Sequence, residues 1–264
     1  MLAADTQAQI LSGGTDFMVE VNFNHRKPST VISLSGTRDL CDWAPTDGGV
    51  RIGAGVTWGE IENGPLSRTL PALAQAARTV GSPQIRAAGT IGGNLGTCSP
   101  AGDGLPVLAA TEATVHLLSV RGERSIPFAD FMTGPKRNAR ADDEIISAVT
   151  MPVLDGGQGY AKVGVRNAMV ISIASACVAL HGDRVRVALG SVGPTIIRAT
   201  DSEAWLDNLN AVPGRAVTPT VAREFGSRVA AEARPIDDHR STAEYRRHAI
   251  SVVSTRLLER ITRP

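Results

Sequence analysis

Cysteine is scarce in this sequence, with only Cys41, Cys98 and Cys177 among 264 residues. The three lie far apart, form no CxxC pair and are odd in number, which argues against a disulfide framework and against a closed zinc site. Unpaired cysteines suit a reducing compartment, so we expect a cytoplasmic protein.

Long apolar runs are also lacking. No stretch reaches the ~18 apolar residues of a membrane span, and the N-terminus has neither the basic region nor the apolar region of a signal peptide. The longest apolar run, 169–180, is interrupted by Ser172 and Ser175 and predicts a buried strand. The sequence therefore predicts no membrane span.

Neither sign of charge dominates the chain. The formal net charge is +1, with 20% charged and 42% hydrophobic residues. This is an ordinary globular composition without the basic excess of nucleic-acid-binding proteins, so we expect no nucleic-acid partner. A length of 264 residues allows two modest domains or one large one.

Several enzyme motifs are absent. No GxxxxGK is present, which excludes a P-loop. Gly53-Ala54-Gly55 has its third glycine one residue late, at Gly59, and no acidic residue about 20 positions on, which argues against a nicotinamide-binding Rossmann fold. The histidines show no metal-ligand spacing, no G-x-S-x-G elbow occurs, and nothing positions a histidine to activate Cys98. We therefore expect no metal site and no catalytic residue of these classes.

What the first half does contain is a repeated pattern of a β-prone run, a glycine-rich turn and the start of a helix, which is typical of α+β or α/β folds. A capping box from Thr57 to Glu60 predicts one helix start. The segment 81–94 lacks periodicity and is expected to be a long functional loop. The other predicted elements are strands at 10–11, 31–34, 51–56, 114–118 and 144–151 and helices at 16–22, 71–80 and 105–110.

A domain boundary is expected at 154–159, where three glycines in four positions interrupt all periodicity. We therefore expect an α+β protein with one domain over 1–153 and a second over 158–264, the second formed by a three-stranded sheet with helices. Its predicted elements are strands at 160–165, 169–180 and 184–191, a hairpin turn at 181–183, and helices at 202–208, 221–233 and 243–261. One face of the last helix is expected to carry Tyr245, Ala249, Val252, Val253 and Leu257.

Two glycine-rich segments are the strongest candidates for a binding site, 12–16 (SGGTD) and 90–96 (TIGGNLG). Glycine lets the backbone approach a ligand closely, and successive peptide N–H groups suit phosphate oxygens. Both segments could instead be tight turns, the commonest use of glycine. The side chains of Thr15, Thr90 and Asn94 favour binding, and two such segments could hold one diphosphate.

Longer blocks around these segments resemble a known family. Segments 11–18 (LSGGTDFM), 52–58 (IGAGVTW) and above all 86–103 (RAAGTIGGNLGTCSPAGD) look like the FAD-binding medium subunit of the xanthine dehydrogenase and carbon monoxide dehydrogenase family. The similarity continues through 143–152 (DEIISAVTMP), Lys162, 166–168 and 243–248 (AEYRRH), so it covers nearly the whole chain. It implies a two-lobed PCMH-type FAD-binding domain followed by a domain of the CO dehydrogenase flavoprotein C-terminal type.

The resemblance implies roles for particular residues. The glycine-rich segments would bind the FAD diphosphate from two sides, and Asp103 would orient polar parts of the cofactor. Ile146 would lie against the flavin ring, although it could be plain strand core. Lys162 would approach the polar edge of the ring and favour its anionic reduced form, although it could be a solvated strand-edge lysine. The implied cofactor contacts are Ser12, Gly13, Gly14, Thr15, Asp16, Thr90, Ile91, Gly92, Gly93, Asn94, Thr97, Ser99, Gly102, Asp103, Ile146 and Lys162.

The resemblance also implies partners. In this family electrons run from a substrate at a molybdenum centre in a large molybdopterin-binding subunit, through 2Fe–2S clusters in a small subunit, to FAD and then to an acceptor. Three cysteines are too few for such clusters here, and FAD would be held without a covalent bond because neither glycine-rich segment contains histidine or cysteine. We therefore expect an oxidoreductase subunit in a dimer of heterotrimers, with NAD⁺, oxygen or quinone as the acceptor.

Two other functions stay open at this point, a redox-inactive nucleotide-binding scaffold and a stand-alone flavin oxidoreductase of the same fold. A scaffold would not need Thr15, Thr90, Asn94 and Asp103 together, and the chain shows no substrate domain with an acid-base pair. Relatives carry a further strand and helix before the first Gly-Gly, whereas only residues 1–11 precede Ser12. We expect either a start codon placed too late or an omitted element, whose loss would expose apolar surface and weaken flavin retention.

Overall fold

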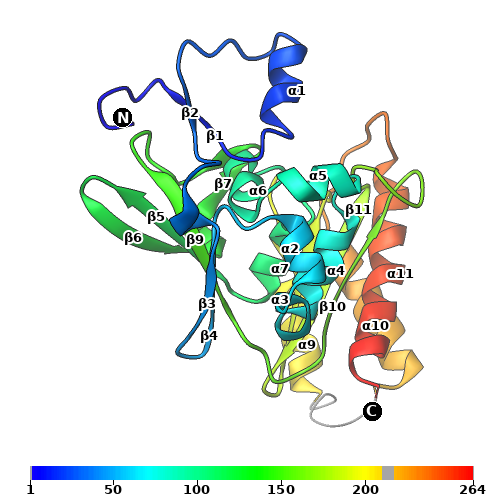
Figure 1. Cartoon of the computed structure of the whole chain (residues 1–264). Helices are drawn as coiled ribbons and strands as arrows, with labels where there is room; N and C mark the ends of the chain where they lie inside the picture. Colours follow the sequence, from blue (N-terminus) through cyan, green and yellow to red (C-terminus); the bar gives the residue numbers. More distant parts are fainter. Residues whose placement is uncertain (1, 210–216, 264) are drawn as a thin grey trace.

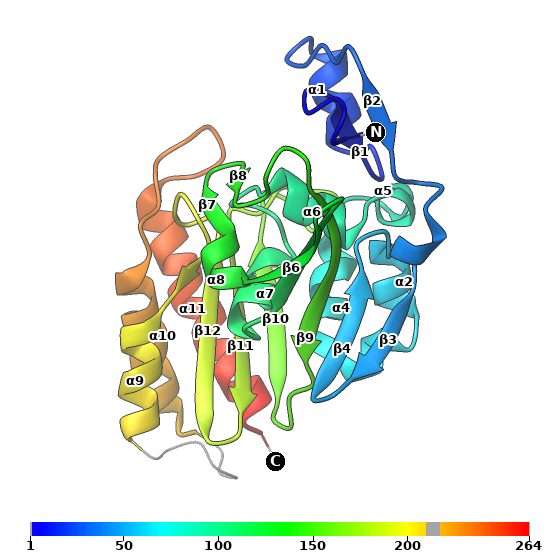
Figure 2. The ribbon, with the colours of Figure 1, turned by 90° about the vertical axis from the view of Figure 1, so that its left-hand side faces the viewer.

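A computed structural model of the chain describes residues 2–209 and 217–263. A small lobe near the N-terminus projects from the rest of the molecule (Figure 1, Figure 2). In this N-terminal lobe, residues 9–34, strands β1 (Gln9–Leu11) and β2 (Val31–Ser33) pair in parallel and helix α1 (Phe17–Asn22) connects them. No residue of α1 is buried, so the lobe has little core of its own.

The first sheet has five antiparallel strands in the order β3-β4-β9-β5-β6. Ile52, Val149 and Val115 lie opposite one another across its central strands and are fully buried, which places the first hydrophobic core on this face. The edge strands β3 and β6 are almost entirely exposed. The bounds are β3 Trp43–Thr46, β4 Gly49–Gly53, β5 Thr114–Ser119, β6 Gly122–Pro127 and β9 Ile145–Pro152.

Short helices complete the first domain. Ile61, Leu73 and Leu108, from three of these helices, are fully buried in the first core. The helices are the 3₁₀ helix η1 (Arg38–Leu40), α2 (Trp58–Asn63), α3 (Leu66–Thr69), α4 (Pro71–Thr79), α5 (Pro83–Ala88), α6 (Ile91–Thr97), α7 (Leu105–Ala110) and α8 (Phe128–Phe131). A small antiparallel pair, β7 (Met132–Gly134) and β8 (Arg137–Asn138), follows α8.

The second sheet is antiparallel in the order β10-β11-β12-β13 and is covered on both faces. On β11, Cys177 belongs to the first core, whereas Ala176 and Val178 belong to a second core with the C-terminal helices. Helices α4 and α7 contact this sheet from the first domain, and α9 and α11 contact it from the second. The bounds are β10 Gln158–Val163, β11 Ala174–His181, β12 Arg184–Gly190, β13 Ile197–Arg198, α9 Thr200–Asn208, α10 Pro219–Glu232 and α11 Ala243–Ile261.

The α+β fold class is confirmed, and so are most of the predicted elements. The capping box forms as expected: Thr57 Oγ1 accepts from the Glu60 N–H at 3.2 Å, and the Glu60 carboxylate accepts from the Thr57 N–H at 2.8 Å. The predicted C-terminal helices correspond to α9, α10 and α11. Strong hydrophobic periodicity and local capping signals therefore predicted these elements correctly.

The segment 81–94 was predicted wrongly as an irregular loop. Helices α5 and α6 both begin in it, with Ser82 and Thr90 as their N-caps. The second sheet also has four strands instead of three, because β13 is only two residues long and leaves no pattern in the sequence. Elements this short lack the periodicity on which sequence predictions depend.

Two predictions about the second domain are also wrong in detail. The run 169–180 is not a strand throughout, because Met169 has a left-handed φ of 50° and β11 begins at Ala174. On α11, Tyr245 does not share the buried face, since it is 49% exposed whereas Ala249 is buried. In both cases the prediction buried a large side chain, Met169 or Tyr245, that is about half exposed in the structure.

Candidate functional site

A cavity of about 810 Å³ lies between the N-terminal lobe and the first domain, within the size range of small-molecule sites. Residues of the lobe line one side, and residues of α6 and the segment after it line the other. Both glycine-rich segments meet here. The expected cofactor contacts that line the cavity are Ser12, Gly13, Gly14, Thr15, Asp16, Thr90, Gly92, Gly93, Asn94, Thr97, Ser99, Gly102 and Ile146.

The first glycine-rich segment forms the turn from β1 into α1. Gly14 has a φ of 75°, a left-handed conformation that glycine adopts without strain. Within the described ranges, the peptide N–H groups of Gly13, Gly14 and Thr15 have no protein acceptor. The Ser12 hydroxyl is hydrogen-bonded to the Thr90 hydroxyl at 2.8 Å, so this turn presents free donors and is tied to the second segment.

The second glycine-rich segment starts helix α6. Thr90 Oγ1 caps the helix by accepting from the Gly93 N–H at 2.9 Å. A Cβ on Gly92 would lie 2.5 Å from the Cβ of Ala54, so this glycine is required for packing. A Cβ on Gly93 would meet Thr90 Oγ1 at 3.2 Å and Ser12 Cβ at 3.9 Å and nothing closer. Gly93 therefore leaves its open side toward the cavity.

Asn94 brings an unsatisfied polar atom to the same wall. Its Oδ1 is buried and has no hydrogen-bond partner among the described residues. A buried polar atom without a partner costs free energy, so a donor from a bound molecule would stabilise it. The free N–H groups and this lone acceptor together suit a ligand with both donors and acceptors, as a dinucleotide cofactor has.

Thr97 and Ile146 complete the wall around α6. The Thr97 hydroxyl donates to the Asp16 carboxylate at 3.3 Å, which is a second tie between the lobe and this helix. Ile146, on β9, is only 7% exposed and belongs to the first core while it also lines the cavity. One side chain can therefore serve as strand core and as an apolar surface for a ligand.

Three expected contacts do not line the cavity. Ile91 is fully buried in the first core. Lys162 Nζ donates to Asp103 Oδ2 at 2.6 Å and to the carbonyls of Thr79 and Val170 at 2.8 and 3.0 Å. Both charged side chains are 8% exposed, so Lys162 is not a solvated lysine; it is paired with Asp103 because a buried charge requires a partner.

The pair belongs to a cluster that joins the two halves of the chain. Asp103 Oδ1 accepts from the Tyr160 hydroxyl at 2.9 Å, and Oδ2 accepts from the Thr79 hydroxyl at 3.2 Å. Burial raises the pKa of Asp103, although the charge of Lys162 opposes the rise. Burial also raises the pKa of Tyr160 well above its ordinary value, so its hydroxyl stays a donor.

Charged residues that the sequence pattern did not indicate also line the cavity, among them Glu20, Arg26, Lys136 and Arg140. Glu20 accepts from Lys136 at 2.8 Å and is paired with Arg26 at 2.8 Å. The hydrogen bond from Lys136 lowers the pKa of Glu20. Lys136 and Glu20 are far apart in the sequence and belong to no local motif, so only the fold brings them together.

No histidine or cysteine is among the residues that line the cavity. Burial raises the pKa of the Cys98 and Cys177 thiols to about 12, which keeps them protonated. Over 2–209 and 217–263, no group of three or more histidine, cysteine, aspartate or glutamate side chains could hold a metal ion. The helices in those ranges include none that is long and apolar enough to cross a bilayer.

Comparison with known proteins assigns the chain to a family. Residues 1–154 match the FAD binding domain in molybdopterin dehydrogenase, and residues 160–261 match the CO dehydrogenase flavoprotein C-terminal domain. The chain belongs to the xanthine and carbon monoxide dehydrogenase family of FAD-binding subunits. Members of this family are subunits of oxidoreductases, and the resemblance drawn from the sequence is confirmed.

Relatives in this family align over most or all of the chain. The nicotine 6-hydroxylase medium subunit of Paenarthrobacter nicotinovorans is 33% identical and covers 93% of this chain and 87% of its own length. The nicotinate dehydrogenase FAD-subunit of Eubacterium barkeri is 39% identical over 68% of this chain, but that alignment spans only 62% of the relative. Carbon monoxide dehydrogenase from Hydrogenophaga pseudoflava contains a chain with a TM-score of 0.87 and 26% identity, covering 99% of this chain and 91% of that one.

Proposed function

We propose that this chain binds FAD non-covalently and passes electrons from a 2Fe–2S subunit to an external acceptor within a molybdenum hydroxylase. The matches to an FAD binding domain and to medium and FAD subunits support this reading. FAD supplies the redox chemistry, and the protein supplies its binding, orientation and electrostatic surroundings. Too few cysteines are present for clusters of that kind in this chain.

The cavity wall suits the parts of an FAD molecule. The free N–H groups of the first glycine-rich segment are donors for diphosphate oxygens, and the open backbone at Gly93 lets the ligand approach from the other side. Arg26 and Lys136 line the cavity and share a single carboxylate partner, Glu20, so together they would offset part of the negative charge of the diphosphate. Asn94 Oδ1 would accept from a donor on the cofactor. We assign Ile91, Asp103 and Lys162 to the support of this wall from behind.

We further propose a large molybdopterin-binding subunit and a small 2Fe–2S subunit as partners, assembled as a dimer of heterotrimers in the cytoplasm. The names of the relatives, among them medium and FAD subunits, support a multi-subunit complex. The buried, unpaired Cys98 and Cys177 suit a reducing compartment.

The observation that carries the FAD assignment is the cavity in which both glycine-rich segments present unsatisfied polar groups. We expect the wild-type chain to take up FAD and to quench its fluorescence. Gly93→Val should weaken binding about tenfold or more, because the new side chain occupies the open side of the cavity. The measurement is a fluorescence titration of apoprotein with FAD.

Gly36→Val is the matched control, because nothing lies within 4 Å of a Cβ placed on Gly36 and the residue does not line the cavity. This variant should bind FAD like the wild type. A colourless wild-type chain that takes up no FAD would refute the proposal, and normal affinity in Gly93→Val would refute the placement of the diphosphate.

A further inference from the structure

The cavity has two wall segments that come from different halves of the chain. Ser99, Ala101 and Gly102 line it from the first domain, and Ile171 lines it from the loop between β10 and β11. Neither segment lies in a helix or strand, so other contacts must hold the segments in place. One buried arginine on α11 donates hydrogen bonds to two backbone carbonyl groups, and each of these carbonyl groups belongs to a residue that is connected to one of the two wall segments.

Arg246 is 4% exposed and lies in the first turns of α11. Its Nη1 donates to two carbonyl oxygens, that of Ile173 at 2.7 Å and that of Ser191 at 2.8 Å. Its Nη2 donates to Asp238 Oδ1 at 2.7 Å. The N-terminal end of α11 lies at the same end of the molecule as the N-terminal lobe (Figure 1, Figure 2).

Each of the two carbonyl groups belongs to a residue that is connected to a wall segment. Ile173 lies two residues after Ile171, and its N–H donates to Val163 O at 2.8 Å. The Ser191 N–H donates to the carbonyl of Pro100 at 2.8 Å, within the segment that carries Ser99 and Ala101. Arg246 is therefore connected to the segment of Ile171 by one hydrogen bond, through Ile173, and to the segment of Ser99 and Ala101 by two, through Ser191.

The backbone at Ser191 needs such support. Its φ of 63° is left-handed, which is uncommon for a residue with a side chain. The neighbouring Gly190 is packed so closely that a Cβ would lie 2.8 Å from the side chain of Pro106. A strained residue persists only when its surroundings hold it, and here the Arg246 bond to Ser191 O and the Pro100 bond to Ser191 N restrain it from both sides.

The chemistry of the bonds requires arginine. A planar guanidinium can donate in fixed directions to two carbonyls and a carboxylate at once, whereas lysine offers a single compact ammonium. The buried charge is balanced by Asp238. Burial alone would raise the pKa of Asp238, but the Arg240 N–H and the Arg246 side chain hold it at about 2, so the carboxylate is ionised at neutral pH.

We propose that Arg246 is a positioning residue for the flavin site, which fixes the spacing of the Ser99–Gly102 and Ile171 walls through the carbonyls of Ser191 and Ile173. The inference rests on the proposed FAD binding in this cavity. It gives the second domain a direct part in the site, although Arg246 itself does not line the cavity. Loss of the bonds should let the two walls separate and should increase the rate at which FAD leaves.

Arg246→Met tests the proposal, because it keeps an unbranched apolar chain and removes every donor. We expect FAD affinity to fall about tenfold, because without these bonds the two walls hold the binding-competent spacing for only a fraction of the time. Arg246→Lys should recover only part of the affinity. Hydrogen exchange at 99–102 and 170–173 in the apoprotein should become faster in Arg246→Met, while exchange in α10 stays the same.

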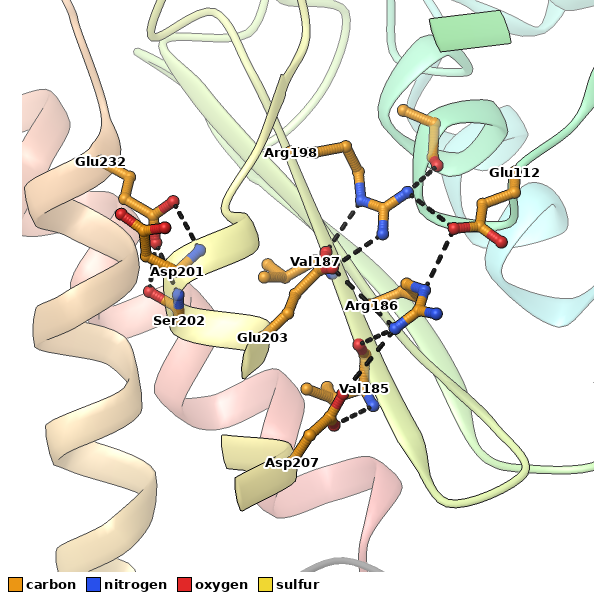
Figure 3. A network of polar contacts seen from close by, with 11 residues as sticks. Glu112, Val185, Arg186, Val187, Arg198, Asp201, Ser202, Glu203, Asp207 and Glu232 are labelled. Atoms are coloured by element: carbon orange, nitrogen blue, oxygen red, sulfur yellow. Dashed lines mark hydrogen bonds and ion pairs between the residues drawn. The ribbon is translucent and has the colours of Figure 1, made fainter. Parts of the chain in front are cut away.

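Arg198→Met is the matched control for a lost arginine contact between the domains, at a side chain that is 22% exposed. Arg198 donates to Glu203 at 2.8 Å and to the Ala109 carbonyl at 3.0 Å (Figure 3), and none of these three residues lines the cavity. The Arg198→Met variant should have a lower melting temperature as the apoprotein, and its FAD affinity should differ from that of the wild type by less than about twofold. Equal loss of FAD in both variants, or wild-type affinity in Arg246→Met, would overturn the inference. If Arg246→Met does not fold, Arg246→Lys with wild-type affinity and exchange would overturn it equally.

The outcome for the wild-type chain separates this inference from the proposed function. A wild-type chain that binds no FAD would refute the function itself. A wild-type chain that binds FAD, with Arg246→Met that binds it equally well, would refute only the role of Arg246. The fluorescence titration used for Gly93→Val gives both answers.

Discussion

The glycines at the cavity serve different purposes. A Cβ on Gly13 would lie 1.8 Å from the carbonyl oxygen of Ala88, and one on Gly92 would lie 2.5 Å from Ala54 Cβ, so both are required by packing. Gly14 is required by its left-handed backbone. Gly93 and Gly96 combine an ordinary backbone with an open side toward the cavity, since a Cβ on Gly96 would meet only Ile146 Cδ1, at 3.9 Å. A sequence displays only the missing side chain, so it cannot separate these reasons.

Glu144 should make stability depend on pH in the acid range. Its carboxylate accepts from Arg124 at 2.5 and 2.7 Å and from the Ala141 N–H at 2.8 Å. These bonds, above all those from Arg124, hold its pKa at about 2, below the ordinary 4.5, although burial opposes the shift. A lowered pKa stabilises the fold above pH 4.5, and this stabilisation is lost as the pH falls toward about 2.

Glu144→Gln should therefore be less stable than the wild type at neutral pH and should lose less stability between pH 4.5 and about 2. Urea unfolding at several pH values measures this difference. Ser227→Ala, at an exposed position of α10, removes no titratable group and should leave the pH dependence unchanged. If the free energy of unfolding changed with pH in the same way for the wild type and Glu144→Gln, the lowered pKa of Glu144 would be contradicted.

At the scale of elements, the sequence predicts best where a buried face repeats. Helices α4, α10 and α11 and strands β5, β9 and β12 correspond closely to the predicted ranges because they pack one face on a core. The edge strands β3 and β6 were not predicted, since their side chains are almost all exposed. Helices α5 and α6 have six and seven residues, too few for a periodic pattern, and their caps Ser82 and Thr90 were not identified as helix starts in the sequence.

The candidate site could be predicted in part, because some of its residues belong to local sequence motifs and others do not. The two glycine-rich segments are local motifs, and the cavity brings them together. The pairing of Lys162 with Asp103 and of Lys136 with Glu20 depends on contacts between distant parts of the chain. Such contacts are fixed by tertiary packing, which the sequence alone does not display.

Helix α2 should depend on its capping box. Thr57 Oγ1 accepts from the Glu60 N–H and donates to its carboxylate at 2.7 Å, and the following residue, Trp58, is 2% exposed and lines the cavity. Thr57→Ala removes the hydroxyl and should lower the free energy of unfolding by about 1 kcal/mol. Urea unfolding of the apoprotein is the measurement.

Ser227→Ala is a suitable comparison for this cap, because Ser227 is exposed in the middle of α10. Alanine favours helix there, so stability should not fall. A Thr57→Ala chain as stable as the wild type would mean that packing of Trp58, and not the cap, fixes the start of α2.

At the scale of the whole molecule, the two domains share buried surface and polar contacts. Tyr160, Cys177 and Ala188 of the second domain belong to the first core. Arg198 and Arg186 both reach Glu112 of the first domain, at 3.4 and 3.2 Å (Figure 3). We propose a boundary between 153 and 158 as a division of the chain, while the extensive contacts across it indicate that the two domains unfold together.

The N-terminal lobe is the exception to this shared packing. Helix α1 contributes nothing to either core. Polar contacts connect the lobe to the first domain across the cavity, including Ser12 with Thr90, Asp16 with Thr97 and Glu20 with Lys136. Segments with few buried apolar contacts open at low free energy cost. A ligand that is bound between the lobe and the first domain should therefore stabilise the lobe more than any other part.

Hydrogen exchange with and without FAD tests this expectation. Binding favours the state in which the lobe is closed on the ligand, by an amount that grows with ligand concentration. FAD should slow exchange over residues 9–34 and leave α10 and the C-terminal half of α11 nearly unchanged, because these helices lie in the second core, away from the cavity. Equal slowing throughout the chain would mean that the lobe opens only when the whole protein unfolds. Unchanged exchange over 9–34 in a chain shown to bind FAD would mean that the lobe is already closed in the apoprotein.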